Sequence, residues 1–550
     1  MKAFLAVCVA APASRHATPD PAVAGAVDPA ARSRLTGDGW LAHTEAEPGD
    51  VITPEGVLTL RLTRSIRTRT ADVATDALAD WLGLRQLYWW QGDGVAAVAT
   101  SALALARLAG QGLDRRHLAL QSLVGWQLGS GTVFASVHKL PPGSAAVLHA
   151  GKVQRVTYVD QLSPGRDEGL APVVAEMATI LRQIHHAYLS DHPDTVLQLS
   201  GGQDSRILLC AIPPEQRVGL HALTLDTHGG PEWTVARRLA DLAGLKHEVH
   251  WLDEQPPPDA EQAHALVDRS ARALDGMASP LALAALLHAE SALDQGHRLS
   301  GAGGETARGF YYPGQPHHAA TSAPLVDRIA DWRLFANEAV EPAALDPSFG
   351  AGARADALEL VRDEFATFDR DWLRATDDLY LYGRTSRWAG VTGTVAAVQR
   401  HFVNPLLDRR VMELALTPDP ALKRDSRLTA ALMRHLDPQL AAVPLDSGLV
   451  PDRLALGGLA ARVAVARHTA RKAARKVRQR LGNTRRAQLG ATAMAALVLA
   501  HWRANPELLD PVRATGVIEP GFLVGLLAGQ SVPATTVAFL ANLAVVGEVA

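Results

Sequence analysis

The chain has 550 residues, of which 47% are hydrophobic and 20% charged, and its formal net charge at pH 7 is −3. This length and hydrophobic content predict two or three domains with sizeable cores, and the small net charge argues against nucleic-acid binding. The two cysteines, Cys8 and Cys210, are too few for a disulfide framework or a metal cluster. We therefore expect a reducing compartment, the cytoplasm.

The first part of the sequence, up to about residue 165, predicts short strands and turns with one or two helices. Its apolar start at 3–11 is expected to be a first buried strand rather than a secretory signal peptide. Further strands are expected at 51–62, 87–100 and 144–149, and helical patterns at 76–81 and 100–109.

A linker at 163–167 and a helix at 172–190 lead to an apolar run at 196–199 that ends in a Ser-Gly-Gly turn. An acid, a hydroxyl and an apolar stretch follow, which is the pattern of a buried strand, a tight loop and a helix N-terminus. Glycines let backbone N–H groups close around an anion, and the helix dipole favours negative charge there. The pattern indicates a nucleotide site rather than a ligand-free turn, and it is not a Walker loop, because no Gly-Lys-Ser/Thr follows.

The side chains of this loop suit a phosphate ligand that carries a metal ion. Ser200 and Ser205 can donate hydroxyls to phosphate, and Asp204 can hold the accompanying Mg²⁺. We refer to residues 200–205 as the pyrophosphate loop.

Strand and helix patterns alternate after this loop, at 219–227, 231–244 and 247–252, which predicts a parallel sheet wrapped by helices. Helical patterns dominate from about residue 324 onward. The apolar stretch at 491–502 is too short to span a bilayer, so we expect no membrane span.

A second Gly-rich turn that carries an acid, Ser-Gly-Ala-Gly-Gly-Glu, lies at 300–305. Two such loops can meet at the carboxyl ends of neighbouring parallel strands, where ligands bind. We refer to residues 300–305 as the second loop.

These motifs resemble the asparagine synthetase superfamily. The two loops match its pyrophosphate motif and its second Gly-rich loop, and Asn-Pro-Leu-Leu-Asp at 404–408 looks like its later Pro-Phe-Leu-Asp segment. The resemblance implies an α/β fold with two domains. Residues 1–165 would form an Ntn-hydrolase-like αββα sandwich, a vestigial glutaminase domain. Residues 166–550 would form an adenine-nucleotide α-hydrolase-like (PP-loop) synthetase domain, mostly helical after about 324.

The resemblance also implies that ATP activates a carboxylate as an acyl-adenylate and that Mg²⁺ assists. Asp204 and Glu305 would be the Mg²⁺ ligands, although the family often has Asp where Glu305 stands. The general base is left open among Asp378, Tyr382 and His401, each of which also has a structural interpretation. The nucleotide-binding set implied by the loops and their strands is Leu199, Ser200, Gly201, Gly202, Asp204, Ser205, Leu225, Gly301 and Gly303.

Departures from the family pattern bear on the substrate. An active glutaminase domain begins Met-Cys, whereas Lys2 stands here, so we expect no ammonia from glutamine and another amine as nucleophile. The β-lactam synthetase branch uses a tyrosine in the second loop and a downstream lysine, where this chain has Ala302 and no lysine at 443–448. The segments at 379–390 and 443–448 look like those of lasso peptide cyclases.

The resulting prediction is a lasso peptide macrolactam synthetase of antibiotic biosynthesis, which joins an Asp or Glu side chain of a precursor peptide to its N-terminal amine. A leader-peptide-binding protein and a leader peptidase are expected partners. Two alternatives stay open, a β-lactam synthetase-like ring closure of a small amino diacid and an inactive peptide-binding scaffold. The basic segment at 461–486, with ten Lys and Arg and no acid, is either a solvated helix face or a docking surface. Its stripe comprises Arg467, Arg471, Arg475 and Arg478.

Overall fold

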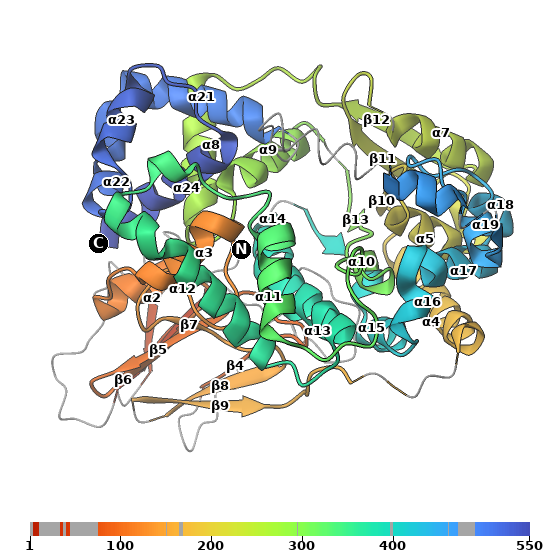
Figure 1. Cartoon of the computed structure of the whole chain (residues 1–550), viewed down its shortest axis with the longest axis horizontal. Coiled ribbons are helices and arrows are strands. Elements are labelled where there is room, and N and C mark those ends of the chain that lie inside the picture. The colour runs from red at the N-terminus through yellow and green to blue at the C-terminus, as the bar shows by residue number, and fades with distance from the viewer. Residues whose placement is uncertain are drawn as a thin grey trace.

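The computed structural model describes three strands of the early chain and most of the sequence from residue 75 onward. The strands are β1 (Phe4–Val9), β2 (Ser33–Thr36) and β3 (Trp40–Thr44). The remaining described residues are 75–149, 151–163, 165, 169–230, 232–293, 295–396, 400–459, 461, 463–470 and 490–549. In Figure 1 the antiparallel sheets lie at the bottom, the parallel sheet at the right and the C-terminal helices at the upper left.

Two antiparallel sheets form the first part of the chain. The larger has the order β2-β3-β1-β6-β5-β7, and the smaller is β4-β8-β9. Their other members are β4 (Thr75–Leu78), β5 (Tyr88–Gly92), β6 (Val95–Ala99), β7 (His138–Lys139), β8 (Ser144–His149) and β9 (Lys152–Thr157).

The alternation of side chains along β6 explains how these layers stack. Ala96 and Val98 pack with Ala146 and Leu148 of β8 between the two sheets. Ala97 and its neighbours on the other face pack instead with α2 (Ala102–Ala109) and α3 (Arg115–Val124). Because successive side chains of a strand point to opposite faces of the sheet, β6 contributes residues to two hydrophobic cores. The layers are helix, sheet and sheet, and within residues 75–163 as described no helix covers the outer face of the small sheet.

Two expectations for this part have opposite outcomes. The start of the chain forms strand β1, as predicted. The helix predicted at 76–81 is wrong, because Thr75–Leu78 pairs with β8 as an antiparallel strand. Asp80 then closes a turn, where its carboxylate accepts hydrogen bonds from the backbone N–H groups of Leu82, Leu84 and Arg85 at 2.9–3.1 Å. Tertiary strand pairing outweighs a short helical pattern.

The parallel sheet has the predicted character. Its order is β12-β11-β10-β13-β14, and every neighbouring pair is parallel. Because the chain runs outward from β10 to β12 and then returns to the other side of β10, the strand order reverses at β10, where α/β proteins bind ligands. The strands are β10 (Val196–Gln198), β11 (His221–Asp226), β12 (Lys246–Trp251), β13 (Arg298–Leu299) and β14 (Phe402–Val403).

Helices surround this sheet. Those near it are α4 (Leu170–Asp191), α5 (Asp204–Ala211), α6 (Pro214–Arg217), α7 (Glu232–Ala243), α10 (Gly304–Ala307), α15 (Arg409–Leu416), α16 (Pro420–Lys423), α17 (Arg427–Leu436), α18 (Pro438–Ala441) and α19 (Pro451–Leu456), with turns η4 (Pro405–Leu407) and η5 (Arg424–Ser426). The middle elements are α8 (Ala260–Ala273), α9 (Pro280–Ser291), α11 (Ala323–Ile329), η1 (Ala330–Leu334), η2 (Pro342–Ala344), α12 (Pro347–Ala366), α13 (Trp372–Asp378), η3 (Leu379–Ala389) and α14 (Gly390–Ala396).

The C-terminal helices join the two halves of the molecule. They are α21 (Ala491–Ala504), η6 (Pro506–Leu509), α22 (Asp510–Ala514), α23 (Pro520–Leu527), α24 (Ala534–Val546) and η7 (Gly547–Val549). They share one core with α2, α3, α8 and α9. Among the described helices, none combines the length and the hydrophobicity that a bilayer crossing needs.

Buried polar contacts also hold the first part against the rest. The Lys139 ammonium, from β7, donates hydrogen bonds to the Gly83 carbonyl at 2.7 Å and to the Ser386 hydroxyl at 2.8 Å. Arg387 of η3 donates to the Gly131 carbonyl at 2.6 Å. These hydrogen bonds hold the antiparallel-sheet part of the chain against the π-helix η3. The same helix carries residues that lie near the loops of the parallel sheet.

Candidate functional site

The two Gly-rich loops are in direct contact. They leave the neighbouring parallel strands β10 and β13, so both emerge at the same edge of the sheet. A Cβ added at Gly301 would lie 2.7 Å from the Ser205 nitrogen, and one added at Gly304 would lie 2.2 Å from Asp204 Oδ1. Only glycine permits this approach of backbone to backbone. The sequence prediction that the loops meet is confirmed.

Hydrogen bonds inside the pyrophosphate loop fix its shape. The Ser205 hydroxyl oxygen accepts from the Ser200 backbone N–H at 3.1 Å, and the Ser200 hydroxyl oxygen accepts from the Gly202 N–H at 3.2 Å. Gln203 is held from outside, since its amide donates to the Ser426 hydroxyl at 3.0 Å. Helix α5 begins directly after the turn at Asp204. A rigid turn with hydroxyls and a helix N-terminus is a suitable cradle for phosphate.

One arginine lies between the two loop carboxylates. Arg308 Nη2 donates to Asp204 Oδ2 at 2.9 Å and lies 3.3 Å from Glu305 Oε1. Burial and the negative charge of Glu305 raise the pKa of Asp204 to about 6, against the opposing charge of Arg308. Arg308 therefore interacts with both carboxylates, and their combined negative charge favours the binding of a further cation.

The remaining oxygen of Asp204 shows what could bind. Asp204 Oδ1 is buried and has no hydrogen-bond partner among the described residues. A divalent cation bound by this oxygen and by Glu305 would neutralise both carboxylates. Mg²⁺ commonly takes one or two protein carboxylates and completes its shell with phosphate and water, and the described residues contain no group of three or more acids, histidines or cysteines that could replace those ligands. The two residues thus fit a Mg²⁺ ion that arrives with a nucleotide.

Tyr380 belongs to the site, and the sequence interpretation missed it. It lies on η3, where its phenol interacts with the Glu305 carboxylate. Burial and the charge of Glu305 raise the pKa of Tyr380 well above its ordinary value, so the hydroxyl keeps its proton. Sequence alone offered two tyrosines in this stretch and no means of choosing between them. Arg308 could have been noticed, because it stands three residues after Glu305, a spacing at which helical side chains meet.

We expect Tyr380→Phe to raise the Mg²⁺ concentration needed for half-maximal activity by about tenfold, because groups that orient a metal ligand typically contribute 10- to 100-fold in affinity. The measurement is a Mg²⁺ titration at saturating ATP. Tyr382→Phe, two residues along the same helix, is the matched control and should leave the titration unchanged. Equal titrations for both variants and the parent chain would contradict this role.

Three residues of the nucleotide-binding set, which the family resemblance places next to adenosine, lie at the carboxyl ends of three neighbouring strands. Leu199 directly follows β10 and is buried, and its N–H donates to the Leu223 carbonyl at 2.9 Å. Leu225 is partly buried near the end of β11, and Gly301 follows β13 against the pyrophosphate loop. In the second loop Gly303 has φ 102°, a conformation that favours glycine. All the predicted nucleotide-binding residues therefore lie at one edge of the sheet.

The other three candidates lie elsewhere. Asp378 accepts a hydrogen bond from Arg370 at 3.0 Å, and the Tyr382 hydroxyl accepts from the Leu162 N–H at 2.8 Å. Tyr382 therefore contacts the segment that ends the first part of the chain directly, and Asp378 does so through Arg370, which donates to the Leu162 carbonyl at 2.7 Å. His401 precedes β14, where its carbonyl accepts from the Arg298 N–H at 2.7 Å. This is the amino end of the strands, opposite the loops, so the structure does not bring these three residues to the site.

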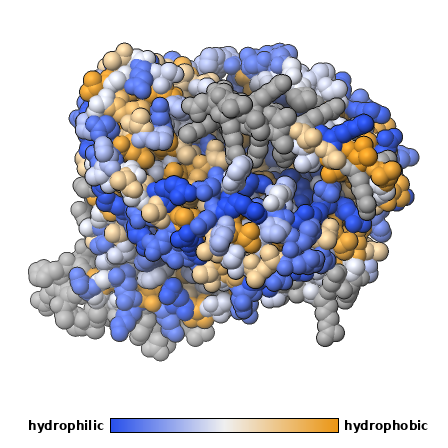
Figure 2. Space-filling view, viewed as in Figure 1, coloured by the Kyte–Doolittle hydropathy of each residue, from blue (hydrophilic) through white to orange (hydrophobic). Residues whose placement is uncertain are grey.

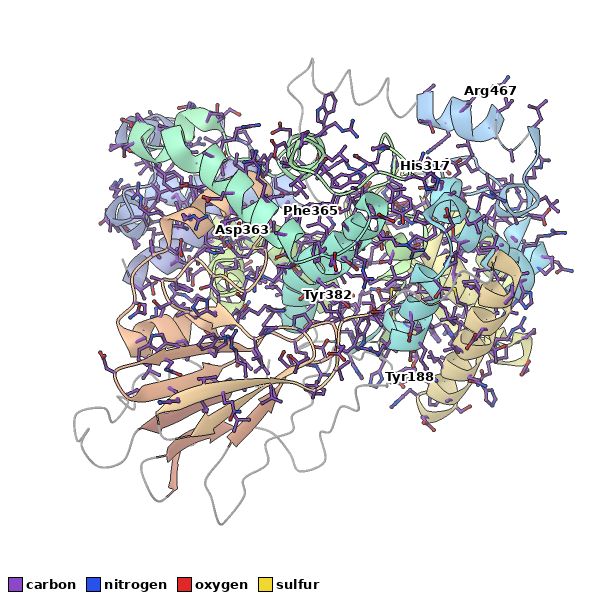
Figure 3. The ribbon with its side chains drawn as sticks, turned by 60° about the horizontal axis from the view of Figure 1, so that its bottom comes forward. Tyr188, His317, Asp363, Phe365, Tyr382 and Arg467 are labelled. Atoms are coloured by element: carbon purple, nitrogen blue, oxygen red, sulfur yellow. The ribbon has the colours of Figure 1, made fainter. Side chains whose placement is uncertain are left out.

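Two features of the sequence fall largely outside the described residues. Lys2 does, and so do Arg471, Arg475 and Arg478 of the basic stripe. Arg467 is exposed at the outer edge of the molecule, as Figure 3 shows. Hydrophilic residues cover much of the middle of the face seen in Figure 2, and hydrophobic residues gather at its right edge. A docking role for the basic segment stays a prediction.

Comparison with known proteins identifies the part of the chain that carries this site. Residues 179–440 match the family model described as asparagine synthase. The match includes both loops, Tyr380 and the parallel sheet, and it ends before α19 and the C-terminal helices. No curated protein matches the chain.

Proposed function

We propose that the chain is an ATP-dependent amide-bond ligase, an AMP-forming macrolactam synthetase that closes a lasso peptide ring. The match of residues 179–440 to the asparagine synthase family model supports the ligase chemistry. The observation that carries the ligase chemistry is the buried, unpaired Asp204 Oδ1 beside Glu305, next to a hydroxyl-lined turn at a helix N-terminus. That arrangement suits a metal-bound polyphosphate.

The proposed reaction has two steps. An oxygen of an Asp or Glu side chain on the peptide attacks the α-phosphorus of ATP, and the bond to the departing pyrophosphate breaks. The peptide's N-terminal nitrogen then attacks the carbonyl carbon of the mixed anhydride, loses a proton and expels AMP. Holding both ends of the peptide in one pocket lowers the entropic cost of ring closure.

The chain's own residues would divide this work. Ser200 and Ser205, with the N–H groups of the turn, would bind the leaving pyrophosphate. Asp204 and Glu305 would hold Mg²⁺, which neutralises phosphate charge when bound. Tyr380 and Arg308 would orient those two carboxylates.

The segment at 443–448 supports a peptide substrate over a small amino diacid. It lies on the pyrophosphate loop, since the Asp446 N–H donates to the Gly201 carbonyl at 3.1 Å and Arg206 donates to the Pro444 carbonyl at 3.1 Å. The β-lactam synthetase branch has its catalytic lysine in this stretch, and none is present here. Ala302 of the second loop is exposed and small, which leaves room beside the loop. A leader-peptide-binding protein and a leader peptidase would supply the peptide.

Isotope exchange between pyrophosphate and ATP tests the proposal. The substrate is a synthetic core peptide with a free α-amine and an internal Asp or Glu. We expect exchange with this peptide and a product that has lost one water. An N-acetylated peptide should still support exchange but give no ring, whereas an Asp→Asn or Glu→Gln peptide should support neither.

Other outcomes point to the alternatives. Exchange with a small amino diacid and none with the peptide would assign the chain to β-lactam-type ring closure. Absence of exchange with every carboxylate offered, while the peptide still binds, would identify a scaffold and overturn the ligase proposal.

A further inference from the structure

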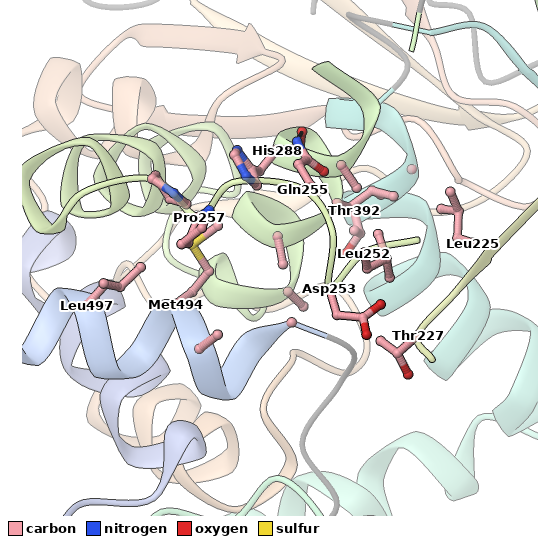
Figure 4. Close-up of a pocket in the computed structure, with 18 of the residues that line it drawn as sticks. Leu225, Thr227, Leu252, Asp253, Gln255, Pro257, His288, Thr392, Met494 and Leu497 are labelled. Carbon is pink, nitrogen blue, oxygen red and sulfur yellow. Dashed lines mark hydrogen bonds between the residues drawn. The ribbon is translucent and has the colours of Figure 1, made fainter. Parts of the chain in front are cut away.

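A cavity of about 610 Å³ opens beside the carboxyl ends of β11 and β12 (Figure 4). Its walls come from five segments of the sequence: Leu225 and Leu252 at the ends of two strands, Ala285 on α9, Trp388 on η3, and Met494 on α21. The volume lies within the range of small-molecule and peptide side-chain pockets.

Three of the polar side chains around the cavity have partners of their own. The Gln255 amide donates to the His288 carbonyl at 2.8 Å, and the Thr392 hydroxyl donates to the Trp388 carbonyl at 3.1 Å. Asp253 pairs with His228 at 2.9 Å. Among the described lining residues none is Lys or Arg. The cavity therefore offers apolar surface and no group to bind phosphate.

Two contacts connect the cavity with the site. Leu225, at its mouth, is also one of the residues that border the expected adenosine position. On the other side the Arg384 guanidinium stacks 4.3 Å from the Trp388 ring and 5.3 Å from the Phe310 ring. The Phe310 ring lies 5.0 Å from the Tyr380 ring, and Tyr380 contacts Glu305. A chain of side-chain contacts therefore connects the cavity wall with the Glu305 carboxylate.

One wall lies outside the family domain. Helix α21 contributes Ala493 and Met494, and it begins at residue 491, beyond the match at 179–440. The loops that would bind ATP are within the match. A pocket closed by an element outside it suits a role in recognising this chain's own substrate rather than ATP.

We propose that this cavity binds apolar side chains of the peptide substrate and so positions its carboxylate at the two loops. The proposal rests on the function proposed above for the choice of a peptide. Contact with the site, and the lack of a Lys or Arg among the lining residues that the structure describes, favour an apolar peptide segment as the occupant over a second nucleotide.

Fluorescence anisotropy with two labelled probes tests this independently of catalysis. The first is the uncharged peptide Ac-Gly-Leu-Phe-Val-Ile-Gly-amide, and the second replaces its apolar residues with Ser, Asn, Thr and Gln. Neither has a carboxylate, so binding does not require adenylation. Ala493→Glu places a charge at the cavity wall, on an exposed position that tolerates substitution. Ala496→Glu, exposed on the same helix and outside the lining, is the matched control.

We expect the apolar probe to bind the parent chain and Ala496→Glu equally, and to bind Ala493→Glu at least tenfold more weakly. ATP affinity should change less than twofold in both variants. Equal probe affinity in all three proteins, or stronger binding of the polar probe, would overturn the inference. A matching loss of ATP affinity in Ala493→Glu would assign the cavity to the nucleotide. Failure of the exchange assay with probe binding intact would refute the ligase proposal alone.

Discussion

Replacing Asp204 with alanine is expected to lower ATP-dependent turnover by roughly a thousandfold. A bound metal contributes several kcal/mol to phosphoryl-group chemistry, and each 1.36 kcal/mol corresponds to tenfold in rate. Asp204 supplies the one buried carboxylate oxygen of the two loops that has no hydrogen-bond partner in the described part of the chain. The measurement is pyrophosphate exchange with saturating Mg²⁺ and peptide.

The same variant should remain folded. Burial raises the pKa of Asp204 to about 6, above its ordinary value, so the carboxylate that is ionised at neutral pH carries a free-energy cost in the folded, metal-free protein. Removing the carboxylate removes that cost, so we expect the midpoint of thermal unfolding without metal to be unchanged or higher. Asp241→Ala, an exposed acid on α7, is the control for activity. Near-parental turnover of Asp204→Ala would reject the metal assignment.

The largest expected effect on stability comes from Glu290→Ala. The Glu290 carboxylate lies 2.9 Å from Arg298 Nη2 and 3.4 Å from Arg400 Nε, and its side chain is only 3% exposed. Arg298 begins β13, the strand that carries the second loop. Removing one partner of a buried ion pair leaves an uncompensated charge and costs about 3–5 kcal/mol.

Urea unfolding followed by tryptophan fluorescence measures this loss. Asp327→Ala is the matched comparison, because Asp327 pairs with Arg362 at 2.7 Å on the surface, where side chains are 34% and 47% exposed. Such a solvent-exposed pair contributes little to stability, because water and salt screen it. If both variants lose the same stability, the buried cluster does not support β13 as we infer.

Local patterns predicted much of the part of the molecule that holds the parallel sheet. The apolar run before Ser200 formed β10, the glycines formed the turn, and the stretch after it formed α5. The second loop was found in the same way, and the contact between the loops followed from the parallel sheet. These signals lie within a few consecutive residues, so no distant partner is needed to recognise them.

Choices between chemically similar residues depended on the tertiary structure. Tyr380 and Tyr382 are two positions apart, and in a helix such positions point in different directions. Packing of η3 turned Tyr380 toward Glu305 and Tyr382 toward Leu162. His401 carried the residue type of a general base, yet its place before β14 put it at the opposite end of the sheet.

The sequence by itself thus determined the parallel sheet, the pyrophosphate loop and the carboxylates Asp204 and Glu305. Each of these features can be recognised from the residue types within a short continuous segment. Only the tertiary structure decided that Thr75–Leu78 is a strand and that Arg308 contacts both Asp204 and Glu305, which are 101 residues apart in the sequence. It also decided that α9, η3 and α21 line one cavity. Those features arise from contacts between segments distant along the chain, and no pattern of neighbouring residues encodes such contacts.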